Sequence, residues 1–331
     1  MAETTGMMKN RPRVPDVAET TGMKKSRQPV SDIVELSRWK LSLAVSFSAV
    51  TGYLLFSGAE SVGGTAAVFH LSGTAVAAGA FLSAVGAFLS AAGVFLLSAG
   101  ASALNQYTER KSDAHMERTA GRPLPSGRMA PPAALAAAAL LLAAGSILLA
   151  VCGTVPLLLG ATSIILYNVI YTGLKKKTTL AIIPGALVGA VPPLIGYTAA
   201  GGAMTDMAII LFALFMFLWQ MPHFWLLLLR YGEEYEKAGI KTFHRILSDS
   251  TIVRLVMAWI TGSSILLWIL AAIYMPFSHI AAIMLLVLNV IFILAFARII
   301  GAGLEGPRSR YAFVAFNSFT AIVMLILIFF A

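Results

Sequence analysis

The sequence predicts an all-α fold in which membrane-spanning helices form a polytopic bundle. Apolar residues make up 58% of the 331 residues and charged residues only 12%, well outside the range of soluble globular proteins. The mean hydropathy is +0.83, and the apolar residues come in long runs rather than in alternation. The one cysteine, Cys152, lies in such a run, so neither a disulfide framework nor a cysteine-ligated metal site is expected.

The apolar runs are long enough for about nine transmembrane helices, at about 20 residues for each span. We expect these helices near residues 40–58, 80–104, 131–151, 155–173, 180–200, 207–230, 252–274, 279–298 and 310–330. Residues 61–79 are less regular, because glycines interrupt a run that is too long for one helix and too short for two. This segment predicts either an extension of the second span or a re-entrant or surface-lying piece.

The basic residues indicate the orientation of the chain. All 24 Lys and Arg residues fall in the N-terminal tail through Lys40 and in alternate connections, near residues 110–128, 175–177, 230–254 and 298–310. Because Lys and Arg concentrate in cytoplasmic loops, a nine-span arrangement with a cytoplasmic N-terminus is predicted. The net charge of +9 is therefore attributed to topology, and no nucleic-acid partner is expected. Residues 1–34 are predicted to be a disordered cytoplasmic tail, and residues 35–331 a single transmembrane domain.

A polar stretch with both charge signs, NQYTERKSDAHMERTAGRPLPSGRM, begins at Asn105 between two apolar runs. If the helix continues into it, Asn105, Glu109 and Asp113 follow one another at intervals of four residues along one face. An amide oxygen and two carboxylates suit Mg²⁺ when phosphate oxygens and water complete its shell. Arg118 and Arg122 follow, and their planar guanidinium groups suit phosphate or carboxylate. The alternative is a hydrophilic loop whose acids and bases pair with one another.

A second polar stretch, LWQMPHFWLLLLRYGEEYEKAGIKTFHR, covers residues 218–245. Gln220 and His223 share a helical face within an apolar segment, and polar groups at such depth indicate a cavity or the bundle interior. Two interpretations of His223 stay open, a haem ligand and a buried histidine that hydrogen-bonds to a backbone carbonyl. Glu233 and Glu234 belong to a second acidic cluster, for which a solvated helix end is the alternative.

Three consecutive lysines, Lys175 to Lys177, follow the fourth span on the same side of the membrane as both acidic clusters. They are suited to holding an anion, although a role as topogenic charges alone is sufficient to explain them. In the next span, Gly189 and Gly196 permit close helix approach, and Pro192 with Pro193 predicts a bend beside a cavity.

With both stretches in view, the chain resembles the haem O synthase (protohaem IX farnesyltransferase) branch of the UbiA-type intramembrane prenyltransferases. The resemblance covers residues 35–325 and rests on NQYTERKSDAHMERTAGRPLPSGR, YTGLKKKT, GAVPPLIGY and WQMPHFWLLLLRYGEEYEKAGI. It implies a helical bundle around a cytoplasm-facing cavity, in which farnesyl diphosphate binds through Mg²⁺. It further implies that the farnesyl group is transferred, with addition of water, to a vinyl group of haem b, which gives haem O.

The resemblance also implies roles for individual residues. The expected metal ligands are Asn105, Glu109, Asp113 and Glu234, of which the three acids are also the expected catalytic residues. The expected substrate-binding residues are Asn105, Arg118, Arg122, Lys175, Lys176, Lys177, Gln220, His223, Arg230 and Glu233. We expect Glu109 and Asp113 to lie in a hydrated pocket rather than in a packed core. The expected aromatic faces for a carbocation are those of Trp219, Phe224 and Trp225, for which plain packing is the alternative.

The same resemblance implies a multi-pass protein of the bacterial cytoplasmic (inner) membrane, whose partners are haem b, farnesyl diphosphate and the lipid bilayer. Haem A synthase or a terminal oxidase assembly is the implied downstream partner. Two other functions fit parts of the sequence. A prenyltransferase of the same fold would act on a quinone precursor or another aromatic acceptor. A transporter or channel fits the apolar composition, but the acids lie toward one surface, whereas transporter sites lie near the midplane between repeats.

Overall fold

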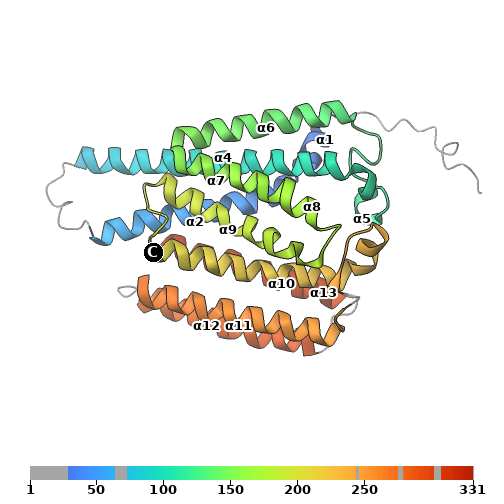
Figure 1. Cartoon of the computed structure of the whole chain (residues 1–331). Coiled ribbons are helices and arrows are strands. Elements are labelled where there is room, and N and C mark those ends of the chain that lie inside the picture. The colour runs from blue at the N-terminus through green and yellow to red at the C-terminus, as the bar shows by residue number, and fades with distance from the viewer. Residues whose placement is uncertain (1–28, 64–72, 244–245, 275–278, 302–306, 331) are drawn as a thin grey trace, which may run out of the picture.

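The computed structural model describes residues 29–63, 73–243, 246–274, 279–301 and 307–330. Within these ranges every regular element is a helix, which confirms the all-α prediction (Figure 1). Nine helices in the described part of the chain are long and apolar enough to cross a membrane. The protein is therefore a multi-pass membrane protein, and its nine candidate spans overlap those expected from the sequence.

The first half of the bundle begins with a short helix that precedes the first span. Its helices are α1 (Pro29–Leu36), α2 (Trp39–Gly63), α4 (Gly73–Asp113), α5 (Glu117–Ala120), α6 (Pro131–Cys152) and α7 (Thr154–Ile164). After α7 the chain passes through a π-helical segment, Ile165–Tyr171, into α8, Thr172–Leu174. These three pieces together make up the fourth candidate span.

The second half starts with a 3₁₀ turn, Thr179–Ala181, that leads into the fifth span. Its helices are α9 (Ile182–Ala199), α10 (Met207–Lys237), α11 (Asp249–Tyr274), α12 (His279–Gly301) and α13 (Pro307–Phe330). Although proline removes a helical hydrogen bond, α9 continues through Pro192 and Pro193, and α10 continues through Pro222. As a result, most of the second polar stretch lies on a single helix.

The N-terminal part of the chain differs from one expectation and favours one of two alternatives for another. Helix α1 begins at Pro29, so the tail that was expected to be disordered does not extend to residue 34; residues 1–28 lie outside the described part. The helix is anchored because Leu36 is fully buried and its carbonyl accepts a hydrogen bond from Gln106 Nε2 of α4 at 2.7 Å. Residues 61–63 end α2 and residues 73–79 begin α4, which favours helix extension, while residues 64–72 are outside the description.

Helices α2 and α9 cross at glycines. A Cβ atom on Gly196 would lie 1.8 Å from the carbonyl oxygen of Ala49, and one on Gly52 would lie 2.1 Å from that of Pro193. Only a residue without a side chain allows two helix backbones to approach so closely. The expected close approach at Gly196 is confirmed, and α9 is held between α2 and α10, which it also contacts.

An aromatic core joins α10 to α12 and α13. The Trp219 side chain is 3% exposed, and its ring stacks on Phe316 and Phe319 with centroid distances of 4.1 and 4.8 Å. Phe292 of α12 completes the cluster at 5.5 Å from Trp219. The expectation that Trp219 offers a face to a carbocation is therefore wrong, because packing occupies its ring.

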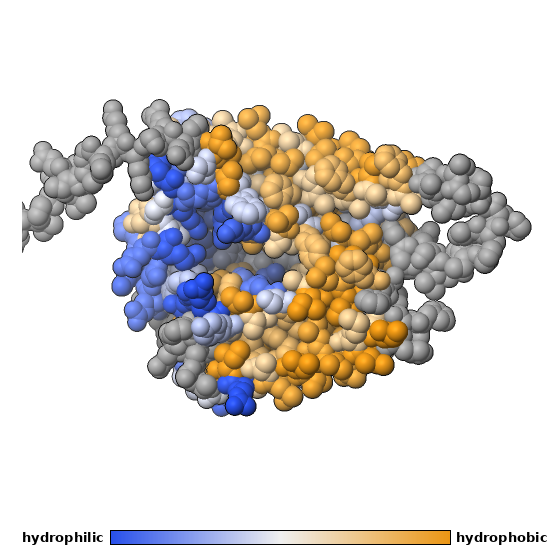
Figure 2. All heavy atoms as spheres, turned by 180° about the vertical axis from the view of Figure 1, so that it is seen from behind, coloured by the Kyte–Doolittle hydropathy of each residue, from blue (hydrophilic) through white to orange (hydrophobic). Residues whose placement is uncertain are grey.

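Hydrophilic residues gather at one end of the bundle, while apolar residues cover the remainder of the face seen in Figure 2. That polar end contains α1, α5 and the C-terminal ends of α4 and α10 (Figure 1). A hollow opens beside it on the same face (Figure 2). The fold thus brings the two polar stretches to one end of the bundle, at the border of the apolar surface.

Candidate active site

The three polar side chains of the first stretch lie on one uninterrupted helix, as the spacing predicted. Asn105, Glu109 and Asp113 all belong to the last turns of α4. Their exposed fractions are 6%, 6% and 1%. The expectation of a hydrated pocket around the two acids is therefore wrong, because each carboxylate faces a basic side chain instead of water.

Glu109 is held by two partners. The Lys175 ammonium nitrogen lies 2.6 Å from Glu109 Oε2, and Asn105 Nδ2 donates to the same oxygen at 3.0 Å. The Asn105 side-chain oxygen in turn accepts a hydrogen bond from Thr172 Oγ1 at 2.9 Å. Burial lowers the pKa of Lys175, while the Glu109 carboxylate opposes this effect. Asn105 therefore orients Glu109 in a hydrogen-bonded chain that links α4 to α8 and its following loop.

Asp113 pairs with a residue from its own polar stretch. Arg122 NH1 lies 2.7 Å from Asp113 Oδ2, and the carboxylate side chain is only 2% exposed. Thr119 Oγ1 donates to the Asp113 carbonyl at 2.8 Å, which folds α5 back over the end of α4. The alternative in which acids and bases of this stretch pair with one another therefore describes Asp113. It does not describe Glu109, whose cation comes from a distant loop.

Side chains from distant parts of the sequence meet at this end of the bundle. The Arg118 guanidinium lies over the rings of Tyr231 and Tyr235, at 5.0 and 5.8 Å from their centroids. The Lys241 backbone N–H donates to the Lys175 carbonyl at 3.1 Å. Both polar stretches and the lysine loop are thus in contact, although more than a hundred residues separate Arg118 from the end of α10.

The remaining lysines of the loop differ in their surroundings. Lys176 Nζ donates to Ser112 Oγ, the residue before Asp113, at 3.1 Å. Lys177 is exposed. Of the three lysines, Lys175 is thus largely buried in an ion pair, whereas Lys176 and Lys177 are exposed.

Glu233 and Glu234 of the second polar stretch differ in burial. Glu234 is half-buried, and its Oε2 is buried without a hydrogen-bond partner in the described part of the protein. Glu233 and Arg230 are exposed, and the Arg230 guanidinium lies 5.0 Å from the Tyr231 ring centroid. Of these charged residues, Glu234 is the one turned into the protein, which is unusual for an acid without a partner.

Gln220 and His223 lie nearer the middle of α10, and both are half-buried. A Cβ atom on Gly189 would lie 2.4 Å from the Gln220 amide nitrogen, so glycine in α9 makes room for this side chain. The His223 ring lies 4.9 Å from that of Phe313. Among the described residues no hydrogen bond joins His223 to a backbone carbonyl, so that interpretation is not supported.

Arg38, in the link between α1 and α2, is a polar residue of this region that the sequence did not indicate, because it falls among topogenic charges. Its φ of 48° lies in the left-handed region, which non-glycine residues seldom adopt. The side chain is half-buried and interacts electrostatically with Tyr167, His223 and Tyr235. No carboxylate within the described ranges pairs with it. Arg38 therefore places a further cation between α10 and the π-helical segment.

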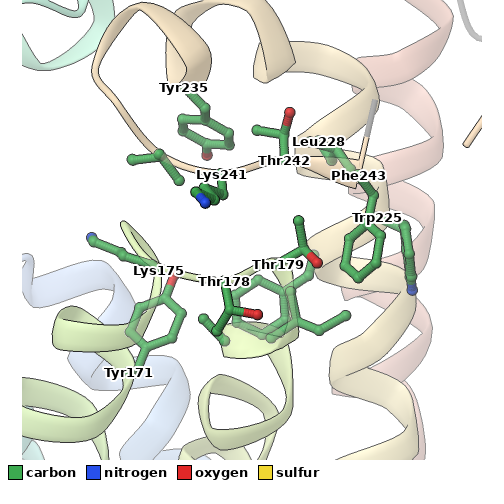
Figure 3. Close-up of a pocket in the computed structure, with 14 residues that line it drawn as sticks. Tyr171, Lys175, Thr178, Thr179, Trp225, Leu228, Tyr235, Lys241, Thr242 and Phe243 are labelled. Carbon is green, nitrogen blue, oxygen red and sulfur yellow. The ribbon is translucent and has the colours of Figure 1, made fainter. Parts of the chain in front are cut away.

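A pocket opens between the loop after α8 and the segment after α10 (Figure 3). Its empty space is about 500 Å³, with the open mouth included. Tyr171 and Lys175 line one side, so the pocket adjoins the ion pair of Lys175. Phe224 and Trp225 contribute to its apolar wall. Two of the three aromatic residues expected to be available to a ligand thus face a cavity.

The residues at the polar end fit a magnesium ion in their donor chemistry. Glu109, Asp113, Glu234 and the Asn105 amide offer only oxygen donors, which Mg²⁺ prefers. In the described part of the chain no three His, Cys, Asp or Glu side chains lie close enough to hold a metal ion together. The unpartnered Oε2 of Glu234 is an acceptor available to a cation. Binding would also require Lys175 and Arg122 to release their carboxylates.

Comparison with known proteins agrees with these observations. A family model described as the UbiA prenyltransferase family matches residues 66–329. A protoheme IX farnesyltransferase of Geobacter sulfurreducens is 49% identical over 142 residues, and one of Sorangium cellulosum is 38% identical over 161 residues. These matches cover 43% and 48% of this chain and 53% and 57% of the relatives. The chain thus spans a little over half the length of these curated relatives.

A solved structure has the same arrangement of helices. It is that of a UbiA homolog from Archaeoglobus fulgidus bound to GPP and Mg²⁺. The TM-score is 0.61, and the match covers 90% of this chain and 99% of that chain at 15% identity. At this identity the likeness concerns the fold alone.

Proposed function

The chain belongs to the UbiA prenyltransferase family, and we propose that it is a protohaem IX farnesyltransferase. The substrates would be farnesyl diphosphate and haem b, and the product haem O. The protein would lie in a bacterial cytoplasmic membrane with its N-terminus in the cytoplasm, because all Lys and Arg residues fall on one side of the predicted topology. Haem A synthase or a terminal oxidase assembly would receive the product.

The observation that carries the proposal is that two acids at the polar end are each paired with a cation that a diphosphate could bind instead. Lys175 neutralises Glu109, and Arg122 neutralises Asp113. A diphosphate that enters this end offers both cations stronger partners, because phosphate oxygens carry more charge than a single carboxylate. The carboxylates would then be free to bind a metal ion. The acids and bases that would hold a magnesium diphosphate thus neutralise one another before it binds.

Each group at the polar end has a role in the proposed reaction. Glu109 and Asp113, with the Asn105 carbonyl, would hold one Mg²⁺, and Glu234 would hold a second or shared ion. The metal would neutralise charge that develops on the leaving diphosphate. The cations that would bind phosphate oxygens are Arg118, Arg122, Lys175, Lys176 and Lys177. Asn105 would keep Glu109 oriented through its 3.0 Å hydrogen bond. Arg38, which lacks a described carboxylate partner, would meet a further oxyanion of either substrate.

The proposed reaction joins the farnesyl group to a vinyl group of haem b and adds water. The allylic C–O bond of farnesyl diphosphate breaks, and the electron pair leaves with the diphosphate. The terminal vinyl carbon of haem b forms the new C–C bond to the farnesyl group, and a water oxygen adds to the other vinyl carbon with loss of a proton. Gln220 and His223 lie deeper on the same helix as Glu234, where an acceptor could meet the farnesyl carbon.

A reconstitution experiment tests the proposal. The purified full-length protein, in detergent or nanodiscs, would be incubated with farnesyl diphosphate, Mg²⁺ and haem b. We expect a product whose mass exceeds that of haem b by one farnesyl group plus one hydroxyl group. Transfer to a quinone precursor with no product from haem b would assign the chain to the other acceptor class. Solute uptake by proteoliposomes that survives Asp113→Asn would favour a transporter.

A further inference from the structure

The pocket beside Lys175 combines a charged rim with an aromatic wall. Figure 3 places Lys241 and Tyr235 on one side of the opening and Lys175 and Thr178 on the other. Lys241 is exposed, and within the described ranges no carboxylate pairs with its ammonium group. Lys175, by contrast, already pairs with Glu109. Lys241 is therefore a cation of the pocket that has no described carboxylate partner, unlike Lys175.

The wall behind these cations is apolar and rich in flat side chains. The rings of Trp225 and Phe243 lie 4.8 Å apart, and those of Tyr171 and Phe224 lie 6.0 Å apart. The indole N–H of Trp225 is buried without a hydrogen-bond partner among the described atoms. Such a wall suits a flat apolar body, whereas its cationic rim suits an anionic group at one edge of that body.

The position of the pocket limits the kind of molecule that would fit. Its rim is formed by the loop after α8 and the segment after α10, which are joined by the hydrogen bond from the Lys241 N–H to the Lys175 carbonyl. Both segments lie where candidate spans end, at the border between the polar end and the apolar surface. A molecule with an apolar body and an anionic edge would lie in the same orientation at such a border.

We propose that this pocket binds the carboxylate-bearing edge of the acceptor, with Lys241 pairing to a propionate of haem b. This inference rests on the proposed function. A prenyl chain fits less well, because its one charged group is the diphosphate, for which the cations around Glu109 and Asp113 are already present. Lys241 then determines affinity for the acceptor and has no part in binding the donor.

A matched pair of ligands tests the role of Lys241. Dissociation constants of haem b and of its dimethyl ester would be measured with the full-length protein in nanodiscs of neutral lipid. The variants are Lys241→Gln and, as a control, Lys237→Gln, because Lys237 is exposed at the end of α10 and does not line the pocket. The ester keeps the flat body but has lost the negative charges.

We expect Lys241→Gln to weaken haem b binding about tenfold, as for loss of a charge-assisted hydrogen bond, and to leave binding of the ester unchanged. Lys237→Gln should alter neither. Unchanged haem b affinity in Lys241→Gln, or an equal loss for both ligands, would overturn the inference. An equal loss of affinity for pyrophosphate with Mg²⁺ would do the same, because the pocket would then belong to the donor.

The same haem b measurements in nanodiscs that contain an anionic lipid test whether the pocket binds a lipid headgroup instead. If the effect of Lys241→Gln on haem b appears only with that lipid, the pocket binds a lipid headgroup and the inference fails. Failure of the proposed function looks different, because the wild-type protein would then form no haem O at all. Normal haem O formation with unchanged haem b affinity in Lys241→Gln contradicts only the role of Lys241.

Discussion

The ammonium nitrogen of Lys175 lies 2.6 Å from Oε2 of Glu109, which joins the loop after α8 to the last turns of α4. Both side chains are largely buried, at 12% and 8% exposure. Either charge alone would be costly in this environment, so the pair should separate only when another charged group replaces the lost partner. The pair therefore connects the proposed metal ligands of α4 to the lysine loop that we propose binds the diphosphate.

The pH dependence of activity should report on Lys175. Burial lowers its pKa, so Lys175 loses its positive charge at a lower pH than an exposed lysine does. Activity that needs this charge falls as the pH rises through the lowered pKa. Arginine stays protonated, so the alkaline limb of kcat/KM for farnesyl diphosphate should move to higher pH in Lys175→Arg. An alkaline limb that is identical in the wild type and the variant would contradict this role; Lys237→Arg serves as the control.

Removing the charge of either acid of α4 should abolish turnover. Glu109→Gln and Asp113→Asn keep the shape of the side chain, so loss of metal and diphosphate binding is expected without a large packing defect. We expect kcat/KM to fall by at least about a hundredfold. The measurement is haem O formation, with thermal unfolding in detergent as a check that each variant is folded. Near wild-type turnover by either variant would rule out the metal-ligand assignment.

Alanine is a poorer test at these two positions. Glu109 and Asp113 are 6% and 1% exposed, and each neutralises a basic partner. Both kinds of variant leave Lys175 or Arg122 without its counter-charge, but truncation also removes the oxygen that accepts its hydrogen bond and the volume of the side chain, at a total cost of about 3–5 kcal/mol. A loss of activity in the alanine variants would then mix a chemical effect with a folding effect.

The role of His223 can be separated from that of the acids. The His223 ring lies 4.9 Å from that of Phe313, and the proposal tested here is that His223 binds haem iron. If His223 binds haem iron, His223→Phe should shift the haem absorption spectrum and lower haem affinity, while pyrophosphate binding with Mg²⁺ stays unchanged. An unchanged spectrum and affinity would dismiss His223 as a ligand.

The sequence predicted those features that depend on local composition. Runs of about 20 apolar residues fix the number of spans, and four-residue spacing placed Asn105, Glu109 and Asp113 on one face of α4. The sequence did not predict ion pairs between distant residues, because no local pattern relates Glu109 to Lys175, which follows it by 66 positions. Arg38 was equally hidden, since its φ of 48° and its neighbours on other helices leave no mark in the sequence.

Packing between α2 and α9 should be sensitive to a single methyl group. In Gly196→Ala the new Cβ would lie 1.8 Å from the Ala49 carbonyl oxygen, and because backbone cannot move aside cheaply, the helices must separate. We expect a loss of stability of about 1–3 kcal/mol, measured by unfolding in detergent. Gly79→Ala is the control, because a Cβ there has no neighbour within 4 Å. Equal stability of the two variants would contradict the close crossing.

Arg128 anchors α1 to the first polar stretch. Its guanidinium pairs with Asp32 and with Glu35, the latter at 2.6 Å, and donates to the Gly121 carbonyl at 2.8 Å. Asp32 is 4% exposed, so Arg128→Ala would leave a buried carboxylate unpaired. We expect this variant to lose about 3 kcal/mol of stability. Because Asp32→Asn removes the stranded charge, the double variant should lose less than the sum of the two single losses. Strict additivity in unfolding measurements would show that the pair contributes nothing, and Arg254→Ala, at an exposed helix position, provides the baseline.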